Sequence, residues 1–125
     1  MNSSPVVSEK FSRDDRLRKR REFEECYASG VRVSGRHVQV FVLADPSRDR
    51  LRLGISVPKR VGNAVARNRV RRRLREIFRR SRGLFPSGGG SLVVNARASA
   101  SAAPFPELSE DFTRSVSRAA RTPRR

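Results

Sequence analysis

Hydrophobic residues recur along this chain with two spacings, one of period two and one close to 3.6. Period two is clearest in residues 36–43, RHVQVFVL. Val38, Val40 and Val42 fall on one face of that segment, and Gln39, Phe41 and Leu43 fall on the other. Because side chains alternate across a β-strand, the pattern predicts a strand with one apolar face and one mixed face.

Three further segments are predicted to be strands. Residues 51–57 alternate in the same way and follow the turn signal ADPSRDR, so we expect them to pair antiparallel with residues 36–43. Residues 31–34 predict a short edge strand, and residues 91–96, SLVVNA, predict a short buried strand. The glycine-rich segment 85–91, which leads into the last of these strands, is expected to be a flexible loop.

The 3.6 spacing predicts three helices. The first is expected over residues 16–28, with Asp14 and Asp15 capping its start and Gly30 ending it. One face of that helix is expected to carry Leu17, Arg20, Phe23 and Tyr27, with Cys26 at its side. The first helix would therefore present an aromatic pair at positions i and i+4.

The second helix is predicted to enter at Gly62 and Asn63 and to end near Arg82, and the third to start near Pro106. Their buried faces are expected at Val70, Leu74, Ile77 and Phe78 in one and at Leu108, Phe112, Val116 and Ala119 in the other. Residues 98–106 read as a low-complexity connector rich in Ala, Ser and Pro.

These elements predict a single small α+β domain, an α/β sandwich with the order α-β-β-β-α-β-α, over residues 14–121. Residues 1–13 are expected to be a mobile tail and residues 122–125 a basic tail. The strands on either side of the second helix should lie parallel in one sheet, for which general chirality favours a right-handed crossover.

The charge of the chain is concentrated in the second helix. Of a net +17, a net +10 lies between Lys59 and Arg82, where eleven basic residues face the single acid Glu76. A solvated helix normally mixes signs, because like charges repel along its surface. A row of guanidinium groups, each a planar fork for phosphate oxygens, instead predicts a polyanion as partner.

Candidate catalytic groups are sparse. The chain has one histidine and one cysteine, no Cys/His cluster with metal-ligand spacing and no glycine-rich phosphate loop, so autonomous catalysis is not expected. His37 is interpreted as a surface or phosphate-contacting residue, and Cys26 as a small apolar residue. For Phe23, Tyr27 and Phe41, core packing and a platform for stacking unpaired bases both remain open. The N-terminus lacks a signal-peptide pattern, and no apolar run approaches a membrane span, so a cytoplasmic protein without a membrane partner is expected.

The segment VGNAVARNRVRRRLRE, residues 61–76, resembles the signature of the bacterial ribonuclease P protein subunit. LRKRREFEECYASG, LRLGISVPKR and SLVVNAR resemble the same family in the expected order, so the resemblance covers about residues 16–97. It implies a ribosomal protein S5 domain 2-like fold whose crossover around the basic helix is left-handed, against the general expectation, and we follow the family here.

The resemblance also implies a function. The partners would be a catalytic ribonuclease P RNA and precursor tRNA, with no protein partner required. The RNA would cleave the 5′ leader of the precursor with Mg²⁺ that it largely binds itself, so that the protein is the accessory subunit of an endoribonuclease, with no catalytic residue and no certain metal ligand of its own.

Two sets of site residues follow from the resemblance. The residues implied to contact the catalytic RNA are Arg60, Asn63, Arg67, Asn68, Arg69, Arg71, Arg72 and Arg75. The residues implied to line a cleft for the single-stranded 5′ leader are Phe23, Tyr27, Gln39 and Phe41. Two alternatives stay open beside this hypothesis, a structural RNA-binding protein such as a ribosomal component and a DNA-binding regulator that inserts the basic helix into the major groove.

Overall fold

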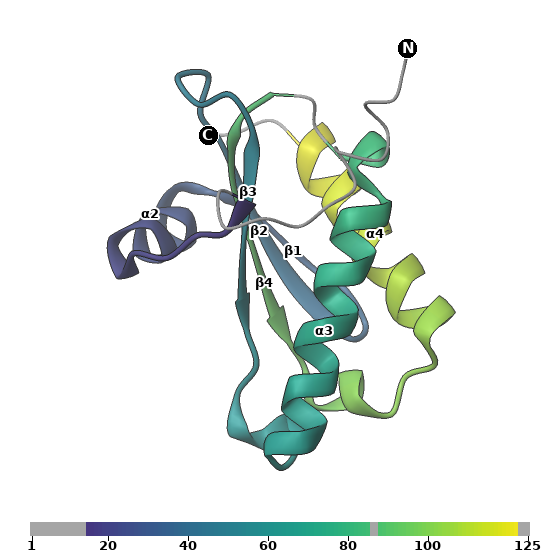
Figure 1. The fold of residues 1–125 in the computed structure, drawn as a ribbon. Coiled ribbons are helices and arrows are strands. Elements are labelled where there is room, and N and C mark those ends of the chain that lie inside the picture. The colour runs from purple at the N-terminus through teal and green to yellow at the C-terminus, as the bar shows by residue number, and fades with distance from the viewer. Residues whose placement is uncertain (1–14, 86–87, 123–125) are drawn as a thin grey trace.

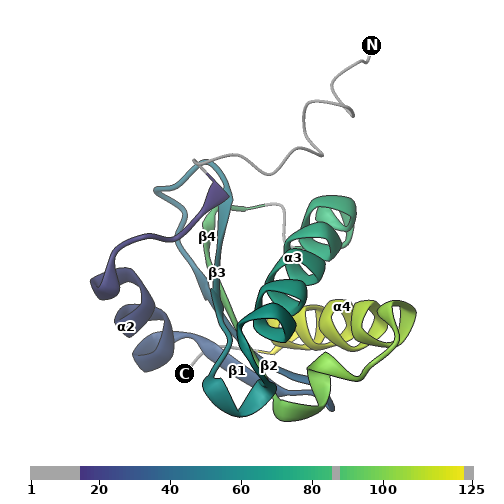
Figure 2. The same cartoon turned by 60° about the horizontal axis from the view of Figure 1, so that its bottom comes forward.

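The structure is a computed structural model that describes residues 15–85 and 88–122. The predicted tail at 1–13, and the predicted basic tail apart from Thr122, lie outside the described residues. The helices are α2 (Arg20–Ser29), α3 (Ala64–Arg80) and α4 (Phe105–Arg121), and the strands are β1 (Val31–Ser34), β2 (Val38–Ala44), β3 (Leu51–Ser56) and β4 (Gly90–Ala96). Helix α2 covers one face of the sheet, and α3 and α4 cover the other (Figures 1 and 2).

The strand order β1-β2-β4-β3 corrects one prediction. β3 does not pair with β2, because β4 lies between them, antiparallel to β2 and parallel to β3. Leu92, Val93 and Val94 of β4 are all fully buried, which suits a central strand covered on both faces. The expected parallel arrangement of the strands that flank the basic helix is confirmed. The left-handed crossover stays a prediction.

The main core lies between the sheet and the pair α3 and α4. The valine face of β2 is directed into it, and the predicted stripes of α3 and α4 are buried there, as the periodicity indicated. Residues 98–101, which belong to the predicted low-complexity connector, form a 3₁₀ helix that ends close to the buried Ala103. Burial of two small residues, Ala100 and Ala103, explains how a low-complexity segment packs without large side chains.

The start of the first helix differs from the prediction. Residues 16–19 are not helical, since Arg16 forms a bridge with Leu53 and the backbone N–H of Leu17 donates to the carbonyl of Leu53 over 2.9 Å. Asp15 is buried and pairs with Arg50 at 3.2 Å and Arg82 at 2.8 Å, so it does not cap the helix. A buried carboxylate so placed is stable only with its cationic partners, which fixes this segment against β3.

Helix α2 is capped by a carboxylate other than the predicted one, and the face that it buries also differs from the predicted face. Glu22 accepts hydrogen bonds from the backbone N–H groups of Arg18 and Lys19 at 3.3 and 3.2 Å, and Gly30 ends the helix as predicted. Cys26, expected at the side, is completely buried between α2 and the sheet. Burial raises the pKa of its thiol to about 11, which fits the predicted packing role.

His37 was expected at the surface and is instead buried, with 4% of its surface exposed. Its Nδ1 lies 2.7 Å from Ser99 Oγ, and its Nε2 lies 2.5 Å from Glu107 Oε2. The neighbouring carboxylate of Asp111 accepts from the backbone N–H groups of residues 36, 37 and 38 at 2.9, 2.8 and 3.2 Å. His37 and Asp111 therefore tie α4 to the turn between β1 and β2, a contact between segments about 70 residues apart.

Candidate nucleic-acid interface

Helix α3 is held by its apolar stripe and by its first turn. Asn63 is its N-cap, with Oδ1 accepting from the backbone N–H of Ala66 at 2.9 Å, as the sequence predicted. The preceding Gly62 has a φ of 153°, a backbone conformation that residues with a side chain rarely adopt. A Cβ at this position would lie 2.9 Å from the Cβ of Ala66. The turn from residues 59–61 into α3 therefore depends on this glycine.

The residues predicted to contact RNA lie along α3 and the turn before it. The exposed ones are Arg60, Asn63, Asn68, Arg69 and Arg72, and the half-buried ones are Arg67, Arg71 and Arg75. Two of them are oriented by local contacts, since Arg67 Nε donates to Gly62 O at 3.2 Å and Arg71 to Asn68 Oδ1 at 3.0 Å. The helix thus presents several partly preorganised guanidinium groups on one element.

The positive charge of α3 is only partly compensated by acidic side chains. Glu76, the one acid of the helix, pairs with Arg79 and Arg80 at 2.5 and 2.6 Å in its last turn. Nearer the middle, burial together with repulsion from Arg16 and Arg71 lowers the pKa of Arg75. An anion bound beside Arg75 would relieve that repulsion.

A pocket of about 230 Å³ lies where α3, β3 and the segment before α2 meet. We call it the arginine pocket. Its lining combines an apolar floor with four guanidinium groups: Leu17, Phe23, Leu53 and Ile55 with Arg16, Arg18, Arg71 and Arg75. It joins one member of the predicted leader set, Phe23, to two members of the predicted RNA set.

Arg16 and Arg18 were missed as site residues. The predicted first helix would have separated Arg16 and Arg18 from α3, whereas the extended segment places them on the lining of the arginine pocket. The run LRKRR carries the only signal in the sequence, a second basic cluster.

The four residues of the predicted leader cleft all lie on the side of the sheet covered by α2, which we call the α2 face. Phe41 is buried, and its ring forms a T-shaped pair with the Tyr27 ring, with centroids 4.8 Å apart and an interplanar angle of 82°. Phe23 is half-buried against β3, where a Cβ on Gly54 would lie 2.6 Å from Phe23 Cζ. Phe41 therefore packs as core, while Tyr27, 39% exposed, keeps a ring available at the surface.

Gln39 belongs to a row of polar residues that crosses the α2 face. In the register of the sheet Ser34 lies opposite Gln39, Gln39 opposite Asn95, and Asn95 beside Ser56. These four residues are the polar row, and each is at least partly exposed. Sequence reasoning missed Asn95, although the single amide in the apolar run SLVVNA was a usable signal.

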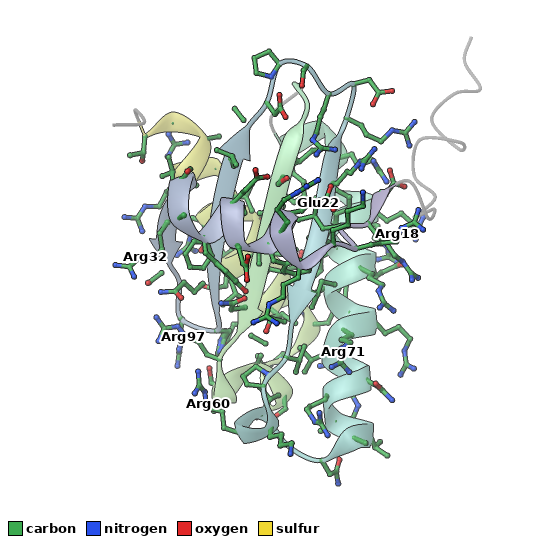
Figure 3. All side chains as sticks on the ribbon, turned by 90° about the vertical axis from the view of Figure 1, so that its left-hand side faces the viewer. Arg18, Glu22, Arg32, Arg60, Arg71 and Arg97 are labelled. Carbon is green, nitrogen blue, oxygen red and sulfur yellow. The ribbon has the colours of Figure 1, made fainter. Side chains whose placement is uncertain are left out.

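Figure 3 shows how charge borders this surface. Helix α2 crosses one half of the sheet, and the other half of the α2 face is free of helix. Arg32, Arg97 and Arg60 lie along one side of the uncovered half, and Arg71 lies on α3 at the other. Over residues 15–85 and 88–122, no three His, Cys, Asp or Glu side chains come together as metal ligands.

Comparison with known proteins shows which family the chain resembles. The family model described as Ribonuclease P matches residues 11–120. The ribonuclease P protein component of Acidothermus cellulolyticus is 38% identical over 108 residues, which span 86% of this chain and 89% of that protein. The Bacillus pumilus component is 42% identical over 64 residues, 51% of this chain, so the chain spans about half (54%) of that relative's length.

The fold agrees with a solved structure as well. The ribonuclease P protein from Thermotoga maritima superposes with a TM-score of 0.74 at 33% identity, covering 82% of this chain and 96% of that one. In the described residues no helix is long and apolar enough to cross a bilayer. With the family model matching most of its length, the chain belongs to the ribonuclease P protein family.

Proposed function

We propose that the chain is the protein component of a ribonuclease P in the cytoplasm, an accessory subunit that helps a catalytic RNA remove the 5′ leader from precursor tRNA. The observation that carries this proposal is the meeting of two RNA-competent surfaces at the arginine pocket. The exposed side of α3 offers phosphate-binding groups, and the adjoining α2 face offers a ring, polar side chains and bordering arginines.

The α3 surface suits a structured RNA. Its exposed arginines on a rigid helix match phosphates held at fixed spacing by a folded RNA, while the buried stripe keeps the helix on the sheet. Such binding is electrostatic and salt-dependent: six phosphate contacts would cost roughly a thousandfold in affinity between about 50 and 200 mM salt. We assign this surface to the catalytic RNA.

The α2 face suits a single strand. Unpaired bases stack on exposed aromatic rings and expose their edges to polar side chains, whereas a duplex hides both. Tyr27 supplies the ring, the polar row supplies donors and acceptors, and the arginine pocket accepts backbone phosphate beside Phe23. A precursor has a leader to bind and the product has none, so this surface favours substrate over product.

Magnesium enters the proposal through the RNA. Its preferred ligands are carboxylate, phosphate and water oxygens in octahedral geometry, and the described residues gather no acidic cluster of that kind. The chain's own contribution is to neutralise phosphates near the junction and to hold the leader in place. That contribution should lower the magnesium concentration that the RNA needs.

The test is reconstitution. Purified chain is added to a bacterial ribonuclease P RNA and a 5′-extended precursor tRNA at a few millimolar Mg²⁺, with protein-alone and RNA-alone controls. We expect cleavage at the mature 5′ end that requires the RNA and is strongly stimulated by the chain. Binding without stimulation would instead favour a structural RNA-binding protein, and cleavage by the chain alone would contradict the accessory role.

A pair of variants separates the two surfaces. Arg72→Ala should weaken assembly with the catalytic RNA, while Phe23→Ala should mainly weaken the affinity of the assembled enzyme for leader-bearing precursor. Equal losses for leader-bearing and leaderless tRNA in the Phe23 variant would contradict the assignment of the leader to the α2 face.

A further inference from the structure

Side chains alternate between buried and exposed along residues 15–18, the segment before α2. Asp15 and Leu17 are buried, whereas Arg16 and Arg18 are exposed and line the arginine pocket. A parallel bridge joins the segment to the edge of β3. Alternation with period two is the pattern of a strand, so the segment continues the sheet beyond β3 and directs both of its arginines to one side.

Repulsion between like charges opposes this placement. The arginine pocket brings Arg16 and Arg18 together with Arg71 and Arg75 of α3. Burial, together with repulsion from Arg16 and from Arg71, lowers the pKa of Arg75, so these guanidinium groups are close enough to repel one another. The segment therefore needs a contact outside the pocket that keeps Arg16 beside α3.

Asp15 makes such a contact. Its side chain is 2% exposed, and its carboxylate lies 2.8 Å from Arg82 Nη2 and 3.2 Å from Arg50 Nη1. Arg82 follows α3 closely in the chain, and its guanidinium carbon lies 4.9 Å from the centre of the Phe78 ring, which belongs to the buried stripe of α3. The residue next to Arg16 is thus fastened to the end of the same helix whose arginines repel Arg16.

We propose that Asp15 is a positioning residue for RNA binding at the arginine pocket. Through its ion pairs it holds Arg16 and Arg18 where they meet a backbone phosphate of the leader, a step that rests on the function proposed above. The effect of this acid has a distinctive sign. If net charge alone determined affinity, removing a negative charge would strengthen binding to RNA. Removing the charge of Asp15 should instead weaken binding, because two arginines lose their placement.

The experiment measures the affinity of the reconstituted ribonucleoprotein for leader-bearing precursor and for leaderless tRNA, with each variant chain at saturation. Asp15→Asn, which keeps the shape and removes the charge, should weaken binding of the leader-bearing precursor about fivefold or more and change binding of leaderless tRNA by less than about twofold. Asp49→Asn is the matched control, since it removes the same charge from a side chain that is 85% exposed and also lies near Arg50, at 3.9 Å. It should change both affinities by less than about twofold.

A double-mutant cycle separates positioning from a general loss of stability. In a chain that already carries Arg16→Ala and Arg18→Ala, Asp15→Asn should no longer weaken leader binding, because no arginine of the segment is left to position. Arg82→Lys keeps the net charge but replaces the planar fork that faces Asp15, so it should weaken leader binding in the same direction. This lysine variant tests the proposal by itself if Asp15→Asn does not fold.

The outcomes distinguish this inference from the function on which it rests. Leader affinity that is unchanged or higher in Asp15→Asn overturns the inference, and so does an equal loss in chains with and without the two arginines of the segment. The proposed function stands in both cases if the unmodified complex still favours leader-bearing over leaderless tRNA. If the unmodified complex binds the two equally, the leader assignment itself fails, and the role of Asp15 fails with it.

Discussion

Helices α3 and α4 have the same length and pack on the same face of the sheet, yet α4 carries both signs of charge and α3 is strongly basic. Each spans 17 residues and buries a continuous apolar stripe. Helix α4 has three acids and three arginines, with Glu107 in its first turn and Arg118 and Arg121 in its last. Helix α3 has eight arginines and one acid, with no acid in its first turn.

The difference shows which charges serve the fold. The charges of α4 complement the helix dipole and fasten the helix to its neighbours, as Glu107 does at His37 and Asp111 at the turn between β1 and β2. Most of the positive charges of α3 have no acidic partner within the helix, so they repel one another. The same core therefore supports one helix built for stability and one suited to a polyanion.

The largest effect should come from the core, where the two helices are alike. Phe112→Ala in α4 and Phe78→Ala in α3 each remove a ring that packs on Phe85, with centroids 5.8 and 5.4 Å away. Each should lower the free energy of unfolding by about 3–5 kcal/mol, measured by urea denaturation. Val65→Ala, at a position 69% exposed, is the control and should change it by less than about 0.5 kcal/mol. A much smaller loss of unfolding free energy in the Phe78 variant would mean that the core does not stabilise the two helices equally.

The next effect should be specific to α4. Asp111→Ala removes the acceptor of three backbone N–H groups and should cost about 1.5–3 kcal/mol of unfolding free energy. Glu110→Ala, which breaks only an exposed pair with Arg114, should cost less than about 1 kcal/mol. Affinity for the catalytic RNA should not change in either variant. Equal costs for the two would show that the acids of α4 act only as surface charge.

The third effect should be specific to α3 and to binding. Arg72→Ala should weaken binding of the catalytic RNA by about tenfold and reduce the dependence of log K on log salt by about 1. Arg114→Ala on α4 removes the same side chain from an exposed position and should leave both quantities unchanged. Filter binding across a salt series measures both. An equal loss for the two arginines would show that net charge, not its place on α3, determines binding.

The smallest effect should come from the one acid of α3. Hydrogen bonding from Arg79, reinforced by the positive charges of Arg79 and Arg80, lowers the pKa of Glu76 below its ordinary 4.5. Glu76 therefore stabilises the fold above about pH 4.5, and that contribution is lost as the pH falls through the lowered pKa. Glu76→Gln should cost about 0.5 kcal/mol or less at neutral pH, and the difference from the unmodified chain should shrink in denaturation curves below pH 4.5. A difference that grows in acid would contradict this account.

The places where sequence reasoning failed share one cause. Strand β3 follows β2 in the chain and was expected to pair with it, but β4, more than thirty residues later, takes that position because it buries apolar residues on both faces. His37 reads as a polar strand end, and only contacts with Ser99 and Glu107 make it a buried residue. Arg16 joins the arginine pocket because its segment follows the edge of β3 instead of starting a helix.

The sequence by itself determined the order of the main strands and helices along the chain, the buried stripes of α3 and α4, the basic character of α3 and the family. Those properties follow from local spacing, charge and signature residues, which a linear chain displays directly. The tertiary structure alone decided the strand order, the burial of Phe41 beneath Tyr27, and the meeting of Ser34, Gln39, Asn95 and Ser56 in one polar row. These are relations between segments far apart in the chain, set by the competition among all of them for the same core.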